Sequence, residues 1–155
     1  MTDTNATTSK ETFYITTPIY YPSGKLHIAG QIDLLVKKGN SIVIGDWKTN
    51  KKIDTKSYFD SKVRSSVKMK FPLNNLDDCN YYHYCLQLST YAYIIESYNP
   101  DFSIEDLVLV HFDHNDNMTV YHLPYLRKEV ERMLSYYEKE HLLQERRLKN
   151  KRIEY

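Results

Sequence analysis

The chain has 155 residues, of which 41% are hydrophobic and 26% charged, and its formal net charge is +1. This length suits one domain with a sizeable core. A net charge so near zero excludes a protein that is basic over its whole surface, so any nucleic-acid-binding face must come from local clustering of cations.

The cysteine content and the distribution of hydrophobic residues exclude further classes of protein. Cys79 and Cys85 are too few for a zinc or iron–sulfur site, which needs about four soft ligands, and for a disulfide-rich secreted fold. No apolar run approaches the ~20 residues of a membrane span, and the polar N-terminus has no apolar signal core. We therefore expect a cytoplasmic protein with no membrane partner.

The first half of the chain predicts a disordered tail followed by three strands. Residues 1–10 are polar and form the expected tail. Branched and aromatic residues and turn signals then predict strands at 13–21, 25–36 and 41–49, with turns at 22–24 and 39–40. Residues 50–75 have no clean period and predict a long basic excursion with room for a short helix.

The second half predicts helix, hairpin and helix. Asp77-Asp78 is a candidate N-cap for a helix that ends near Tyr98, before Pro100. Strands at 107–112 and 118–123 flank a turn. Pro124 suits the first turn of a last helix, and the chain is expected to fray beyond Leu142. The order predicts an α/β or α+β domain with a mixed sheet at 11–145, and a charged C-terminal tail at 146–155.

The hairpin around Gly39-Asn40 carries the candidate chemistry. If these residues form a two-residue turn, Asp33 lies opposite Asp46 and Gln31 opposite Lys48. One face then holds Asp33, Asp46 and Lys48. The other face is expected to pack as core, and it carries Ile32, Leu34, Val36, Val43 and Trp47. Directly opposed carboxylates destabilise a sheet, and a bound Mg²⁺ resolves that conflict. The alternative is a surface hairpin in which Asp46 and Lys48 form a solvated ion pair.

Three motifs resemble a known nuclease family. Ala29-Gly30-Gln31-Ile32-Asp33, then Ile44-Gly45-Asp46-Trp47-Lys48-Thr49, then Gln87-Leu88-Ser89-Thr90-Tyr91 are similar to the G-x-x-D, D-[YW]-K-T and Q-x-x-x-Y series of RecB-like and phage-type PD-(D/E)XK nucleases. The resemblance covers roughly residues 25–112. It implies an α/β restriction-endonuclease-like core, a central mixed β-sheet flanked by helices.

The resemblance also implies roles for the motif residues. Asp33, Asp46 and the Trp47 carbonyl would bind Mg²⁺ or Mn²⁺, and Lys48 would act on the attacking water. Gln87 and Tyr91 would support the site or contact the DNA backbone. Without the motifs, Gln87 would be ordinary helix surface and Tyr91 ordinary core. His83, on the same predicted helix face, is interpreted as a surface or half-buried histidine and not as a ligand.

A second resemblance concerns residues 10–28, which are similar to the start of bacterial methionyl-tRNA synthetases. The signature H-I-G-H of those enzymes is here His27-Ile28-Ala29-Gly30, without its second histidine. The K-M-S-K-S loop is absent as well. We therefore do not expect synthetase activity, and His27 is interpreted as a strand residue.

The basic excursion after Lys48 is a candidate DNA-binding flap, with aromatic residues interleaved among its cations; a solvated loop is the alternative. Its candidate contacts are Lys51, Lys52, Lys56, Lys62 and Arg64.

Together these features predict a divalent-metal-dependent DNA nuclease. The resemblance implies a phage-type exonuclease of recombination, replication or repair, acting in the bacterial cytoplasm, as a homo-oligomer or within a larger assembly. The alternative is a catalytically inactive domain of the same fold that binds DNA or has a structural role. It is kept because family members carry a helix, often with a glutamate, before the first strand, and only Glu11 lies in that region here.

Overall fold

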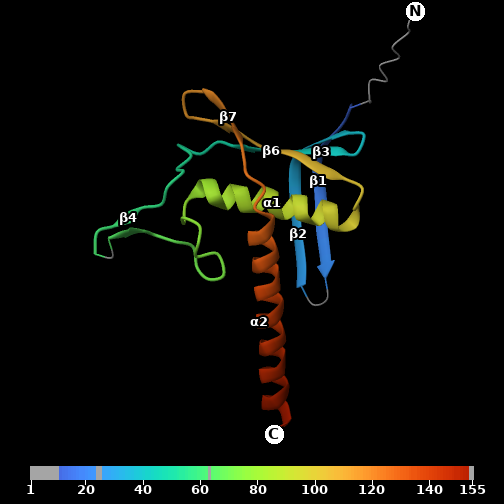
Figure 1. The fold of residues 1–155 in the computed structure, drawn as a ribbon, viewed down its shortest axis with the longest axis vertical. Coiled ribbons are helices and arrows are strands. Elements are labelled where there is room, and N and C mark those ends of the chain that lie inside the picture. The colour runs from blue at the N-terminus through green and yellow to red at the C-terminus, as the bar shows by residue number, and fades with distance from the viewer. Residues whose placement is uncertain (1–10, 24–25, 63, 154–155) are drawn as a thin grey trace, which may run out of the picture.

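The computed structural model describes residues 11–23, 26–62 and 64–153. The tail predicted at 1–10 lies outside these ranges. The main feature is a five-stranded mixed sheet of strand order β1-β2-β3-β6-β7 (Figure 1). Its strands are β1 Glu11–Ser23, β2 Leu26–Lys38, β3 Ser41–Lys48, β6 Ser103–Phe112 and β7 Met118–His122. Neighbouring strands are antiparallel except β3 and β6, which are parallel.

The predicted register between β2 and β3 is confirmed only near the turn. Gly39 has a φ of 60°, and the ladder runs from Lys38 opposite Ser41 to Leu34 opposite Gly45. There it stops, so the predicted pairs Asp33–Asp46 and Gln31–Lys48 do not form. Beyond this point β2 continues against β1, while β3 continues against β6 as far as Lys48. The sheet therefore forks at Asp33 and Asp46.

The fork coincides with an irregularity in β1. Thr16 has a φ of 55°, and the β1–β2 ladder omits the Thr16–Asp33 pair between Ile15–Leu34 and Thr17–Ile32. As a result Leu35 on one side of Asp33 and Ile32 on the other both pack into the same core. A regular strand cannot bring residues separated by an odd number of positions to one face.

The predicted assignment of the two sheet faces was wrong in part. Helix α1 Asn80–Tyr98 covers the face that bears Asp46, because it connects β3 to the parallel strand β6 and must cross the sheet on one side. Ile42 and Ile44 are buried there, and Ile32 joins them. Leu34, Val36 and Val43 on the opposite face are only half-buried, and Trp47 is 45% exposed.

Helix α1 ends at Tyr98, as predicted, but it begins later than predicted. Its N-cap residue is Cys79, not Asp77 or Asp78. Both aspartates are engaged elsewhere: Asp77 accepts hydrogen bonds from Ser66 and Lys68, and Asp78 contacts His83. The helix buries Cys85, Leu88 and Ala92 against the sheet, among others.

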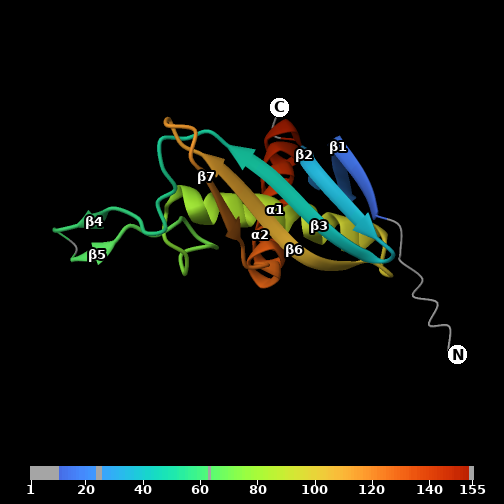
Figure 2. The same cartoon turned by 90° about the horizontal axis from the view of Figure 1, so that it is seen from above.

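The basic excursion has no helix among its described residues. It forms a small hairpin of two strands, β4 Phe59–Asp60 and β5 Ser65–Ser66, which extends from the body beside the start of α1 (Figures 1 and 2). Asp77 ties its base to the body through Lys68, Ser66 and the backbone N–H of Ser57.

The last helix, α2 Arg127–Ile153, begins after Pro124 and continues well past Leu142, so the predicted fraying was wrong. Buried Val130 and Leu134 fix its first turns. In Figures 1 and 2 α1 lies beneath the sheet and α2 extends away from it. No described helix is long and apolar enough to cross a membrane.

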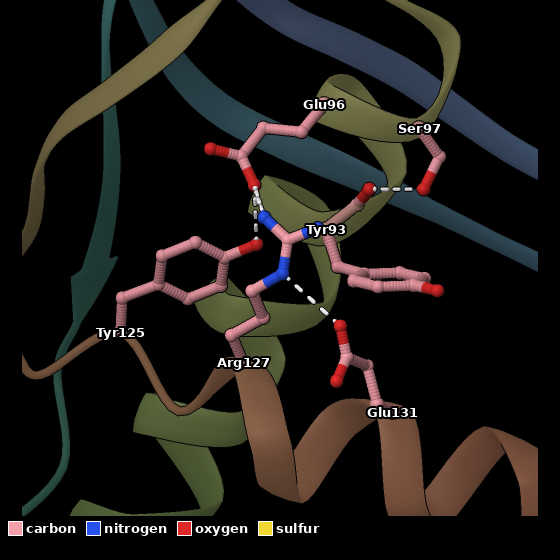
Figure 3. Close-up of polar contacts among 6 residues, drawn as sticks. All are labelled: Tyr93, Glu96, Ser97, Tyr125, Arg127 and Glu131. Carbon is pink, nitrogen blue, oxygen red and sulfur yellow. Dashed lines mark hydrogen bonds and ion pairs between the residues drawn. The ribbon is translucent and has the colours of Figure 1, made fainter. Parts of the chain in front are cut away.

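A polar cluster joins the start of α2 to α1 (Figure 3). The Tyr125 hydroxyl and the Arg127 guanidinium both donate to Glu96 Oε2, at 2.8 and 2.7 Å, and Arg127 Nε donates to Glu131 at 3.1 Å.

The chain is an α/β protein with a central mixed sheet and two helices, an architecture compatible with a restriction-endonuclease-like core.

Candidate functional site

The candidate site lies at the fork in the sheet. Asp46 and Lys48 are alternate residues of β3, so both side chains point toward α1. Asp33 lies on β2 where that strand leaves β3. Its Oδ2 accepts a hydrogen bond from the backbone N–H of Trp47 at 3.3 Å. This bond replaces the ladder and holds Asp33 beside the Asp46–Lys48 segment.

Asp46 is the buried member of the pair, with 3% of its surface exposed. Lys48 Nζ lies 2.6 Å from Asp46 Oδ2. The buried oxygen is therefore paired with a cation. Burial raises the pKa of Asp46 above 3.8, Lys48 opposes this rise, and the Asp33 charge adds to it.

The Lys48 ammonium is held from a second side by α1. Its Nζ lies 5.0 Å from the centre of the Tyr84 ring, a cation–π distance, and its side chain is 22% exposed. Tyr84 was not among the predicted site residues. The available signal was spacing, since it lies three residues before Gln87 and seven before Tyr91, on the same face of a helix.

Gln87 and Tyr91 interact with each other. Gln87 Nε2 donates to the Tyr91 hydroxyl at 3.2 Å. The Tyr91 ring lies so close to Gly30 that a Cβ built there would be 2.6 Å from Tyr91 Cε1. The first and third motifs are therefore in direct contact. The hydrogen bond of Gln87 goes to Tyr91 and not to either carboxylate.

The chain after Lys48 is fixed by polar contacts that the sequence did not predict. His111, buried and paired with Lys48 across the parallel ladder, donates from Nε2 to the Asn50 carbonyl at 2.7 Å. Asn50 Nδ2 donates to the Tyr84 hydroxyl. The Asn80 side chain binds the backbone of Lys52 and Asp54. These bonds anchor the basic excursion to α1.

The predicted cations of the excursion are exposed at positions 51, 52, 56, 62 and 64. Lys52 is paired with Asp54, with Nζ 2.7 Å from Oδ1. His83 is exposed and contacts Asp78 at 2.8 Å, in agreement with its interpretation as a surface residue.

Within the described ranges no group of three or more His, Cys, Asp or Glu side chains could hold a metal ion. The carboxylates of Asp33 and Asp46 lie at the fork, and Trp47 follows Asp46 in β3. Carboxylate oxygens are the hard ligands that suit a divalent ion such as Mg²⁺, which keeps several waters.

Comparisons with known proteins give weak likenesses. No protein-family model matches the chain. A candidate exonuclease from Eubacterium rectale matches over 79% of this chain and 43% of its own, with 11% identity and a TM-score of 0.46. A protein named SSO0001 matches over 80% and 45%, with 17% identity and a TM-score of 0.37. The chain spans less than half the length of these two structures.

Proposed function

We propose that this chain is a divalent-metal-dependent nuclease domain that hydrolyses phosphodiester bonds in DNA. The observation that carries the proposal is the buried Asp46, beside Lys48 and Asp33 at the fork of the sheet. A buried carboxylate with a raised pKa is costly for folding, and such groups concentrate at functional sites. The motif series supports the same conclusion.

Each residue of the site has a role in this proposal. Asp33, Asp46 and the Trp47 carbonyl would hold Mg²⁺ or Mn²⁺, which when bound supplies Lewis-acid stabilisation of phosphate charge and acidifies water. Lys48 can donate to an attacking water or a phosphate oxygen, and its charge offsets negative charge that develops on phosphorus oxygens. Gln87 and Tyr91 support the site by fixing α1 against Gly30.

The finer assignment rests on the resemblance to PD-(D/E)XK nucleases. It points to a phage-type exonuclease of recombination, replication or repair that acts in the bacterial cytoplasm. Exposed cations after Lys48 are suited to phosphate contacts. A homo-oligomer or a larger assembly is part of the same proposal.

The test is cleavage of end-labelled linear DNA, single- and double-stranded, with Mg²⁺, with Mn²⁺ and with EDTA. We expect cleavage that requires metal and falls by about 10²-fold or more in Lys48→Ala, since loss of one charge-stabilising donor costs that much. Lys139→Ala, an exposed lysine of α2, is the matched control and should cleave normally. Cleavage that Lys48→Ala retains would refute the assignment.

A second candidate function, an inactive domain that binds DNA or serves in an assembly, has one observation in its favour. Only two acidic side chains meet at the fork among the described residues. Melting curves separate the candidates: a working site should gain stability with Mn²⁺, and the gain should vanish in Asp33→Ala. DNA binding without that gain and without cleavage would favour the inactive domain.

A further inference from the structure

The basic excursion concentrates the positive charge of an otherwise acidic chain. Residues 51–71 contain seven Lys and Arg against two Asp, a net charge of +5, so the remaining residues carry −4. The segment begins three residues after Lys48. A polyanion is therefore attracted to this part of the molecule in particular, next to the proposed site.

The same segment presents aromatic rings to solvent. Tyr58 is 76% exposed and Phe59 59% exposed. Neither ring stacks on another ring of the described residues, whereas the exposed Phe71 packs against Tyr136 with ring centres 5.2 Å apart. Burying an aromatic ring is favourable, so two open rings on one small hairpin are available to a ligand.

The backbone that carries these rings is well anchored. Val67 donates to the Tyr58 carbonyl at 2.9 Å, and Asp78 N–H donates to the Val67 carbonyl at 3.0 Å. The hydrogen bond from Lys68, with smaller contributions from Ser57 and Ser66, lowers the pKa of Asp77, which keeps this anchor charged. These hydrogen bonds hold the backbone that carries the two rings.

Tyr58 also borders a cleft of about 450 Å³ between the excursion and the start of α1. Lys52 and Lys56 line this cleft together with Asp54, Asp78 and Asn80. Lys52 is paired with Asp54, and Asp78 contacts His83. The volume accommodates a nucleotide, and the lining offers the flat Tyr58 ring and the Lys56 ammonium. This is the pairing of groups that single-stranded nucleic acids require, since bases stack on rings while phosphates contact cations.

We infer that the excursion binds single-stranded DNA, with unpaired bases stacked on Tyr58 and Phe59 and the backbone held by Lys56 and its neighbouring cations. This inference rests on the proposed function and specifies its substrate. In duplex DNA the base faces are covered by neighbouring bases, so these rings have nothing to stack on. The strand enters the site unpaired, across the cleft beside Tyr58.

The experiment is binding, measured by fluorescence anisotropy with the full chain in EDTA, so that no metal-dependent hydrolysis contributes. The probes are a labelled oligo-dT of about 20 nucleotides and its duplex with oligo-dA. We expect tighter binding of the single strand. Tyr58→Ala and Phe59→Ala should each weaken that binding on the order of tenfold and leave duplex binding unchanged.

Two controls define the result. Tyr58→Phe keeps a ring and should bind like the unaltered chain, and Phe13→Ala removes a ring that is 61% exposed on β1 and should have no effect. Equal binding of both probes, or single-strand binding that survives Tyr58→Ala together with Phe59→Ala, would overturn the inference. If the chain bound single strands through these rings but cleaved no DNA in the presence of metal, this inference would stand and only the proposed hydrolysis would be refuted.

Discussion

At the scale of single residues, the buried carboxylate of Asp46 lowers the free energy of unfolding at neutral pH. Burial raises the pKa of its carboxyl above 3.8 even though the Lys48 ammonium lies 2.6 Å away. The folded chain therefore binds more protons than the unfolded chain between 3.8 and the raised pKa, and stability falls as the pH rises through that window. At neutral pH the charged form is held at a cost.

This cost predicts that Asp46→Asn is more stable than the unaltered chain at pH 7 without metal. Each kcal/mol recovered raises Tm by about 2–4 °C in a chain of this size. The difference should shrink as the pH falls toward 3.8, because Asp46 then becomes neutral. Melting curves across that pH range measure both effects.

The matched control is Asp101→Asn, since Asp101 is exposed and its replacement should leave Tm unchanged at every pH. A Tm for Asp46→Asn below that of the unaltered chain at pH 7 would mean that the attraction to Lys48 exceeds the cost of burial.

At the scale of elements, the seating of α1 on β2 depends on Gly30. In an ordinary strand position, replacing glycine by alanine stabilises by roughly 0.5–1 kcal/mol. Here the new Cβ would lie 2.6 Å from the Tyr91 ring. We expect Gly30→Ala to destabilise by about 1–3 kcal/mol, as measured by urea unfolding.

A double-mutant cycle isolates the cause. In a Tyr91→Ala background the ring is gone, so Gly30→Ala should become neutral or stabilising. An equal cost in both backgrounds would show that strand geometry, and not the contact with Tyr91, explains the glycine.

The elements also show what the sequence could predict. Alternation and the Gly39-Asn40 turn were sufficient for the β2–β3 register near the turn, and Pro100 identified the end of α1. The fork was not predictable, because it depends on the left-handed Thr16 of β1 and on the Trp47 N–H bond to Asp33. Local pairing rules contain neither contact.

That the candidate site residues lie close together was predictable from the sequence, but their arrangement was not. Asp33, Asp46 and Lys48 do lie together, but by a side chain-to-backbone bond and not as opposed strand partners. Tyr84 and His111 were missed because a tyrosine on a helix and a histidine on a strand resemble ordinary core residues until β3 and α1 are placed around them.

At the scale of the whole molecule, the separation of charge predicts how binding responds to salt. The chain as a whole has a charge of +1, so general attraction to DNA is weak and salt dependence should come from the excursion alone. Each phosphate neutralised on a single strand contributes a slope of about −0.7 to log K against log[salt].

The five predicted cations set the expected slope. Lys52 is already paired with Asp54, so four or five phosphate contacts are available, and the slope for oligo-dT should be about −3. Lys56→Ala should reduce its magnitude by about 0.7. Lys139→Ala, which removes the same charge from α2, should leave it unchanged. If both variants lowered the slope equally, binding would follow total charge, and the excursion would have no special part in it.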